Sequence, residues 1–247
     1  MGDALSAGTI SLDAHGGDAI EAYLARPDGD ERRGGVVFIH HMPGYDRASK
    51  EIVRRFAELG YDAIGPNLHY REAPGAAPDD AAAASRAAGG VPDDRLIGDV
   101  GAAAAYLRAL PTSNGKVGVI GHCSGGRQTV LAACNLDVDA AVDCYGAFVT
   151  EDVPADFPVK MVPLKDQLPS LRCPLLGLFG NDDQHPSPDA VDELERLLQE
   201  SGKTYDFHRY DDAGHAFFSV DRPSYRVAAA NDGWERITDF FAANLGS

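Results

Sequence analysis

Residues 116–127, with the sequence KVGVIGHCSGGR, decide the fold. The first five residues predict a buried strand, a G-x-C-x-G turn begins at Gly121, and the residues that follow are typical of a helix. In this arrangement, called a nucleophile elbow, glycines are needed because side chains two residues from the nucleophile would collide. Cys123 occupies the nucleophile position, at a helix N-terminus whose peptide dipoles favour a thiolate. The segment therefore predicts a nucleophilic cysteine at the carboxyl edge of a sheet.

Simpler interpretations of this segment remain open. It could be a glycine-rich turn that buries a cysteine, or a loop that cradles a phosphate. A dinucleotide site is disfavoured, because its fingerprint normally occupies the first strand–helix turn, where this chain has Pro43-Gly44. A nucleophile also needs an acid and a base, so the decision depends on the rest of the chain.

Two later strand ends carry suitable partners for Cys123. The strand expected at 175–179 is followed by GNDD, which places Asp182 and Asp183 at its carboxyl end, and the strand expected at 204–210 is followed by DDAGH, which ends in His215. The histidine would take the thiol proton and later protonate the leaving group, while an aspartate would fix its tautomer. A helix cap and a surface histidine are the ordinary alternatives. The order nucleophile, acid, base is nevertheless that of α/β-hydrolases.

Short apolar runs and amphipathic stretches alternate along the rest of the chain. Strands are expected at 19–25, 36–39, 61–64, 116–120, 140–145, 175–179 and 204–210, and helices at 49–59, 93–110, 125–133, 187–199 and around 234–241. Two stretches, 71–92 and 146–174, are expected to be irregular because the first is rich in Ala, Pro, Gly and Asp and the second contains five prolines. This alternation predicts an α/β fold with a mostly parallel, doubly wound sheet flanked by helices, and one domain over residues 1–247.

Composition restricts the class of protein. The chain has 247 residues, 44% of them hydrophobic and 24% charged, as in globular proteins. A formal net charge of −16 disfavours nucleic acid and anionic membranes as partners. No stretch approaches the roughly 20 apolar residues of a membrane helix, and the N-terminus lacks a secretory signal. Since the four cysteines form no CxxC pair, we expect reduced thiols in the cytoplasm, with Cys134, Cys144 and Cys173 buried.

Several segments resemble the dienelactone hydrolase (carboxymethylenebutenolidase) family of the α/β-hydrolase superfamily. They are GHCSGG at 121–126, LGLFGNDD at 176–183, GHAFF at 214–218 with RPSY at 222–225, and PNL and REAPG between 66 and 75. The likeness covers roughly residues 10–245. It implies the α/β-hydrolase fold and a catalytic triad of Cys123, Asp183 and His215. Asp183 is favoured over Asp182 because it stands three residues after the glycine, as in the family's G-x-x-D.

The fold also calls for two backbone N–H groups that bind the oxyanion of the tetrahedral intermediate. One belongs to the residue after the nucleophile and the other to a loop after an earlier strand. The sequence HHMPGY follows the strand expected at 36–39. We therefore expect the N–H groups of Ser124 and Met42 to form the oxyanion hole.

On the substrate side the chain departs from the family. Where the family commonly has a glutamate that interacts with the resting thiol, this chain has His41, which either takes a related role or simply lines the loop. The resemblance assigns Arg71 to a substrate carboxylate, and the alternative is a salt bridge with a residue such as Glu72. A second arginine and a serine of the family are replaced by Ser219 and Ala216, which weakens the case for dienelactone itself.

Two further expectations concern the surroundings of the site. Tyr145 follows another strand and is expected either to line the pocket or to pack in the core. His40, His41, His69 and Cys123 do not have the spacing of metal ligands, so we expect no metal.

The sequence thus predicts a cofactor-free enzyme that hydrolyses small esters or lactones through a cysteine thioester, acting as a monomer or weak homodimer on a small-molecule substrate. A thioesterase or acyltransferase with the same triad is the first alternative. A non-catalytic binding or sensor protein on the same fold is the second. A redox-active thiol protein is a further alternative, although no resolving cysteine stands next to Cys123.

Overall fold

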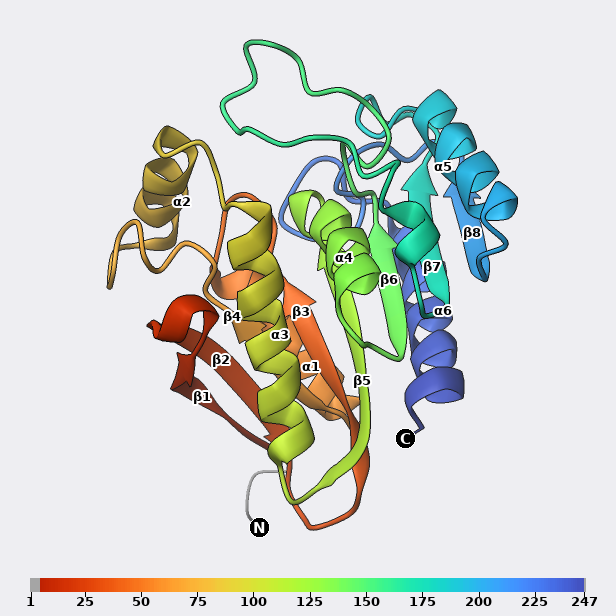
Figure 1. Cartoon of the computed structure of the whole chain (residues 1–247). Helices are drawn as coiled ribbons and strands as arrows, with labels where there is room; N and C mark the ends of the chain where they lie inside the picture. Colours follow the sequence, from red (N-terminus) through yellow and green to blue (C-terminus); the bar gives the residue numbers. More distant parts are fainter. Residues whose placement is uncertain (1–4, 247) are drawn as a thin grey trace.

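The computed structural model describes residues 5–246, which form an eight-stranded sheet in the order β1-β2-β4-β3-β5-β6-β7-β8 (Figure 1). β1 pairs with β2 and β2 with β4 in antiparallel fashion, whereas every pair from β4 to β8 is parallel. The strands are β1 (Leu5–Asp13), β2 (Ala19–Pro27), β3 (Arg33–Ile39), β4 (Asp62–Pro66), β5 (Ser113–His122), β6 (Ala140–Cys144), β7 (Leu175–Gly180) and β8 (Tyr205–Tyr210).

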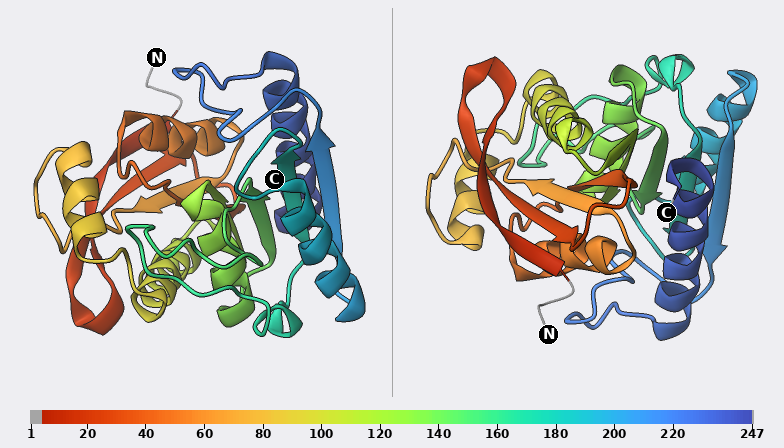
Figure 2. Two further views of the ribbon diagram at one scale, coloured as in Figure 1. Left: turned by 90° about the horizontal axis from the view of Figure 1, so that it is seen from above. Right: turned by 90° about the horizontal axis from the view of Figure 1, so that it is seen from below.

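Helices cover both faces of the sheet, as Figure 2 shows for α1 and α6 on one face and α3 and α4 on the other. The core is therefore in two parts, one beneath α1 and α6 and the other beneath α3, α4 and α5. None of the helices in the described range is long and apolar enough to cross a membrane. The helices are α1 (Arg47–Glu58), α2 (Pro78–Ala87), α3 (Asp93–Ala109), α4 (Ser124–Asn135), α5 (Pro188–Glu200) and α6 (Val227–Leu245).

The parallel strands bring their carboxyl ends to one edge of the sheet, at the top of Figure 1. β3 is buried along its whole length, as expected of an apolar strand covered on both faces. The register pairs Ile39 with Gly121 and His122 with Cys144. The loops that follow β3, β5 and β6 therefore leave the sheet side by side.

The predicted α/β fold is confirmed, with two local corrections. Residues 71–92 are not wholly irregular, because they contain α2, which begins at Pro78 in the first helical turn. The sequence does not predict β1, because eight of its nine residues lie outside the buried core at the edge of the sheet, so the strand lacks a clear apolar pattern. The second irregular stretch, 146–174, contains only the short 3₁₀ helix η2 (Leu168–Ser170).

Candidate active site

Cys123 lies at the turn between β5 and α4 in a strained backbone conformation. Its φ of 58° and ψ of −122° are rarely adopted by residues other than glycine, and its N–H donates to the carbonyl of Cys144 at 3.0 Å. A Cβ on Gly121 would come within 2.1 Å of the carbonyl oxygen of Gly125, and a Cβ on Gly125 within 2.2 Å of that of Ile39. The steric reason for both glycines of the elbow is thus present in the structure.

His215 and Asp183 meet at the ends of β8 and β7. The Nδ1 atom of His215 lies 2.8 Å from Oδ2 of Asp183, and Oδ1 of the same carboxylate accepts the N–H of His185 at 2.9 Å. Asp183 is only 4% exposed, whereas Asp182 is exposed to solvent. The structure therefore brings Asp183, and not its neighbour, to the histidine.

The surroundings of His215 favour its protonated form. Burial alone would lower the pKa of the imidazole, but the hydrogen bonds with Asp183 and Cys123 outweigh burial and raise the pKa to about 10. At neutral pH the ring therefore carries its proton.

The buried ring of Tyr145 packs against the ring of His215. It is buried, its ring centroid lies 5.2 Å from that of His215, and its hydroxyl lies 3.2 Å from Nδ1 of His122. Burial raises the pKa of the Tyr145 phenol above its ordinary range, and the nearby thiols of Cys144 and Cys123 add to the shift. Tyr145 therefore stays a neutral phenol that supports the catalytic-histidine candidate from the core side.

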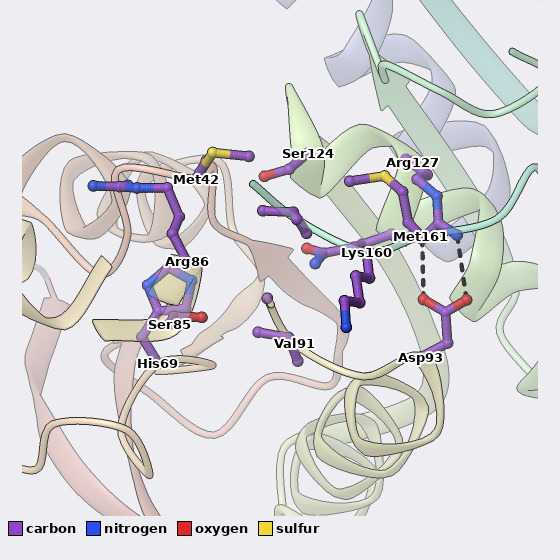
Figure 3. A pocket seen from close by; sticks show the side chains of 13 residues that line it. Met42, His69, Ser85, Arg86, Val91, Asp93, Ser124, Arg127, Lys160 and Met161 are labelled. Carbon is purple, nitrogen blue, oxygen red and sulfur yellow. Dashed lines mark hydrogen bonds and ion pairs between the residues drawn. The ribbon is translucent and has the colours of Figure 1, made fainter. Parts of the chain in front are cut away.

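The two expected oxyanion donors share a small pocket. Met42 and Ser124 both line a cavity of about 40 Å³, and Figure 3 shows both in the upper part of the view. Neither N–H donates a hydrogen bond to another described residue, and the N–H of Ser124 belongs to the first turn of α4, where no helical acceptor exists. Both groups are thus free to donate to a ligand.

The same pocket has a cationic lining that the sequence analysis missed. Arg86 on α2 and Lys160 of the 146–174 loop line it, and neither side chain forms an ion pair with a described residue. A third cation, Arg127, is already paired with Asp93 at 3.1 Å, as the dashed lines in Figure 3 show. The only sequence signal was that Arg86 and Lys160 are isolated bases in otherwise acidic or neutral stretches.

A larger cavity, of about 540 Å³, opens on the other side of the elbow, toward α1 and α6. His122, immediately before Cys123, lines this cavity, whereas Ser124, immediately after it, lines the smaller pocket. The size is that of a typical small-molecule site. Aromatic and aliphatic side chains and three cations balanced by three carboxylates complete the lining, namely Phe38, Ile52, Phe218, Trp234, Arg47, Arg55, Arg222, Asp46, Glu51 and Asp221.

His41 lies in the wall of the larger cavity. Its Nε2 atom is 2.9 Å from Oδ2 of Asp46, the residue whose other carboxylate oxygen caps α1 by accepting the N–H of Ser49. Burial opposes ionisation of Asp46, but the hydrogen bonds from His41 and Ser49 prevail and lower its pKa to about 2. His41 is therefore anchored to a permanent carboxylate, with Ser219 in the same cavity wall.

Arg71 is engaged in ion pairs and lines neither of the two cavities. Its guanidinium donates to both carboxylate oxygens of Asp99, at 2.8 and 3.0 Å, to Asp18 at 2.8 Å and to the carbonyl of His15 at 3.1 Å. These bonds engage all three nitrogens of the guanidinium and join α3 to the loop between β1 and β2. Glu72, the alternative partner, instead pairs with Arg95. Arg71 is thus held in ion pairs with Asp18 and Asp99, which favours the salt-bridge alternative, while its contact with a substrate stays a prediction.

The other sequence candidates have plain positions. Cys134, Cys144 and Cys173 are buried free thiols, as predicted, while Cys123 is partly exposed. His40 and His69 pack ring against ring at 4.7 Å. Among the described residues, no three His, Cys, Asp or Glu side chains gather as a set of metal ligands.

The strand order, the parallel sheet covered on both faces and the strand–turn–helix at Cys123 define the chain as an α/β-hydrolase. Residues 20–245 match the sequence profile of the dienelactone hydrolase family. The chain belongs to that family, and is therefore a hydrolase of the carboxylic ester class.

Known relatives agree with this assignment. A protein of Methylorubrum extorquens, provisionally named carboxymethylenebutenolidase, is 35% identical over 240 residues, covering 96% of this chain and 81% of the relative. The carboxymethylenebutenolidase of Pseudomonas putida is 30% identical over 218 residues, covering 84% of each protein.

A solved structure agrees as well. The crystal structure of a provisionally named dienelactone hydrolase from Klebsiella pneumoniae has a TM-score of 0.85 at 28% identity and covers 97% of this chain and 99% of its own. The same α/β-hydrolase architecture therefore extends over nearly the whole of both chains.

Proposed function

We propose that this chain hydrolyses an ester or lactone of a small anionic carboxylic acid through a thioester on Cys123, with His215 and Asp183 as base and acid of the triad. The observation that carries the proposal is the pairing of His215 with Asp183 at 2.8 Å, because this carboxylate and the sulfur of Cys123, which stands on a nucleophile elbow, together raise the pKa of the histidine to about 10. Met42 and Ser124 are the proposed oxyanion donors.

In the acylation step the Cys123 thiolate attacks the ester carbonyl carbon and forms the C–S bond. The carbonyl oxygen becomes an oxyanion, which the N–H groups of Met42 and Ser124 stabilise. When the intermediate collapses, the ester C–O bond breaks and the His215 imidazolium gives its proton to the departing alkoxide. The raised pKa of His215 supports this role, because the ring holds a proton before the attack.

In the deacylation step His215 has to act as a base. Once the sulfur is acylated it no longer carries the charge or accepts the hydrogen bond that help to raise the pKa of His215. Burial still lowers the pKa of His215, and only the bond with Asp183 then remains to raise it. The neutral imidazole can therefore remove a proton from water as the water attacks the thioester, and the acid is released with the thiolate restored.

The charge around the two cavities favours an anionic substrate. In the larger cavity, three cations face three carboxylates, so its lining is balanced. The small pocket beside the oxyanion donors instead has Arg86 and Lys160 without ion-pair partners, in a chain whose net charge is −16. A carboxylate of the substrate would gain most from these two cations. The apolar walls of the larger cavity would hold the remaining carbon skeleton.

The test is ester hydrolysis by the wild type, Cys123→Ala and the matched variant Cys134→Ala, with dienelactone and p-nitrophenyl acetate as substrates. We expect turnover of at least one ester, its loss in Cys123→Ala, and full retention in Cys134→Ala, whose thiol is buried. Mass spectrometry of acid-quenched wild type should show one acyl group on the peptide that contains Cys123.

Two outcomes would contradict the proposal. Activity that survives in Cys123→Ala would exclude the thioester route. An acyl-enzyme that transfers to an added thiol faster than to water would instead favour the acyltransferase alternative, and faster turnover of thioesters than of oxygen esters would favour the thioesterase.

A further inference from the structure

His40 is a buried histidine that the proposed reaction does not use. It is the first residue after β3 and only 3% exposed. Its Nδ1 atom lies 2.9 Å from the carbonyl oxygen of His41, and its Nε2 atom lies 3.1 Å from the backbone N–H of Leu68, which follows β4. The ring therefore links the loop after β3 to the loop after the neighbouring strand.

The two partners fix the state of the ring. Burial and the neighbouring His69 lower the pKa of His40 to about 3, so the imidazole is neutral at any working pH. A carbonyl oxygen can only accept, so Nδ1 must carry the proton, and Nε2 must accept the N–H of Leu68. Both ring nitrogens are thus satisfied in one tautomer, which leaves the ring no other orientation of equal energy.

The hydrogen bond at Nδ1 controls the peptide group that joins His41 to Met42. In a trans peptide the carbonyl and the following N–H point in opposite directions and lie in one plane. The His41 oxygen is fixed twice, by His40 and by the N–H of Gly44 at 2.9 Å. These two hydrogen bonds fix the plane of the peptide group that joins His41 to Met42, and with it the direction of the Met42 N–H.

The Met42 N–H is the group whose direction matters for the chemistry. It has no acceptor among the described residues, and Met42 lines the same small pocket as Ser124. A Cβ on Gly125 would lie 3.0 Å from the carbonyl oxygen of His40, so this loop packs directly on the turn that carries Cys123. A rotation of the 41–42 peptide would remove the donor from the site without moving the nucleophile.

We propose that His40 is a positioning residue of the oxyanion hole: by holding the carbonyl of His41, its ring keeps the Met42 N–H directed at the oxyanion. This inference rests on the proposed function, because it presumes acyl transfer to Cys123. It adds a side chain to a site whose oxyanion donors are otherwise backbone groups, and so makes the oxyanion hole accessible to mutation.

Two substitutions separate the two ring nitrogens. In His40→Asn the amide nitrogen occupies the place of Nδ1, so the donor to His41 is kept while the acceptor for Leu68 is lost. In His40→Gln the longer amide reaches the place of Nε2, so the acceptor for Leu68 is kept while the donor to His41 is lost. A general structural role predicts similar damage in both, whereas the positioning role predicts that only the Gln variant loses acylation.

The readout compares two reactions of the same sulfur. Acylation by p-nitrophenyl acetate forms an oxyanion, whereas alkylation by iodoacetamide is a displacement at a saturated carbon and forms none. Loss of an oxyanion donor costs about 10²–10³ in rate in other enzymes. We expect His40→Gln to acylate at least about tenfold more slowly, with an unchanged rate of alkylation at Cys123. His40→Asn should acylate close to the wild-type rate and show the lower melting temperature of the two.

Each contrary result has its own meaning. Equal acylation rates in His40→Gln and wild type would overturn the inference, as would a parallel loss of acylation and alkylation. If His40→Gln does not fold, a His40→Asn variant that alkylates normally but has lost acylation still overturns it. Should the wild type alkylate at Cys123 yet form no acyl-enzyme with any ester, the proposed function fails first, and the inference with it.

Discussion

The Nδ1 atom of His215 and the Oδ2 atom of Asp183 lie 2.8 Å apart, at the carboxyl ends of the neighbouring strands β8 and β7. Only 2% of the Asp183 side chain is exposed, against 35% of that of His215. The buried carboxylate of Asp183 therefore holds the Nδ1 side of the His215 ring, while the rest of the ring is partly exposed. This arrangement orients the imidazole and compensates its positive charge.

The first prediction concerns this pair. Asp183→Asn should lower kcat by about 10²–10⁴, because a neutral amide neither fixes the tautomer of His215 nor stabilises its charge. The control is Asp182→Asn, which changes the exposed neighbouring carboxylate and should leave kcat within about twofold of wild type. Steady-state hydrolysis of one ester by both variants is sufficient. Equal losses of kcat in the two variants would mean that Asp183 is not the acid of the triad.

The sequence predicts an element of the fold correctly where the local pattern of residues has a local physical cause. The apolar run of β3 and the glycines around Cys123 have local causes, namely burial on both faces and a steric limit at the elbow. β1 and α2 lack such a signal, because the one is a largely exposed edge strand and the other is rich in alanine without an apolar stripe.

The residues of the candidate site also differ in whether the sequence alone predicts their position. Cys123, Asp183 and His215 each follow a strand, so their order in the chain already predicts that they converge. Arg71 could not be judged from the sequence, because its partner Asp99 is 28 residues away on α3. Arg86 could not be identified from the sequence, because it lies on α2, which the sequence does not predict, and the pocket that it lines also takes residues from distant segments such as Met42 and Lys160.

The second prediction tests whether Arg71 serves stability or substrate binding. Arg71→Gln should lower the free energy of unfolding by about 3–5 kcal/mol, because it leaves Asp99, which is fully buried, without its countercharge. Removing Arg196, which forms exposed ion pairs on α5, should change the free energy of unfolding far less, because solvent screens these pairs. Urea titration of both variants gives the comparison. A stable Arg71→Gln protein with a raised KM would restore the substrate role.

The third prediction concerns Arg86 as an anion-binding group. Arg86→Gln should raise KM about tenfold or more for an ester that carries a free carboxylate, since a charge-assisted hydrogen bond contributes roughly 1.5–3 kcal/mol. The same ester with its carboxylate methylated should have an unchanged KM. Arg222→Gln, in the larger cavity with balanced charge, is the matched variant and should discriminate less between the two esters. If both esters respond equally to Arg86→Gln, the arginine shapes the pocket without recognising charge.

The fourth prediction follows from Asp143, a fully buried carboxyl group on β6. One oxygen accepts the N–H of Gly146 at 2.7 Å, and the other has no hydrogen-bond partner in the described residues. Burial raises its pKa from 3.8 to about 7, and the bond from Gly146 only partly offsets this. Between these two values the folded state binds a proton that the unfolded state has lost. The contribution of Asp143 to stability is therefore greatest below about pH 4 and declines as the pH rises toward 7.

Asp143→Asn should remove this decline, because the amide keeps an acceptor for Gly146 and does not titrate. Because the pKa of Asp143 rises from 3.8 to about 7 on folding, the difference in unfolding free energy between variant and wild type should move in favour of the variant by on the order of 4 kcal/mol between pH 4 and pH 8. Urea unfolding of both proteins at several pH values measures the slope directly. The control is Asp182→Asn, whose carboxylate is exposed and should give a difference that hardly changes with pH. A constant difference between Asp143→Asn and wild type across this range would mean that the carboxyl group is ionised in the folded protein despite its burial.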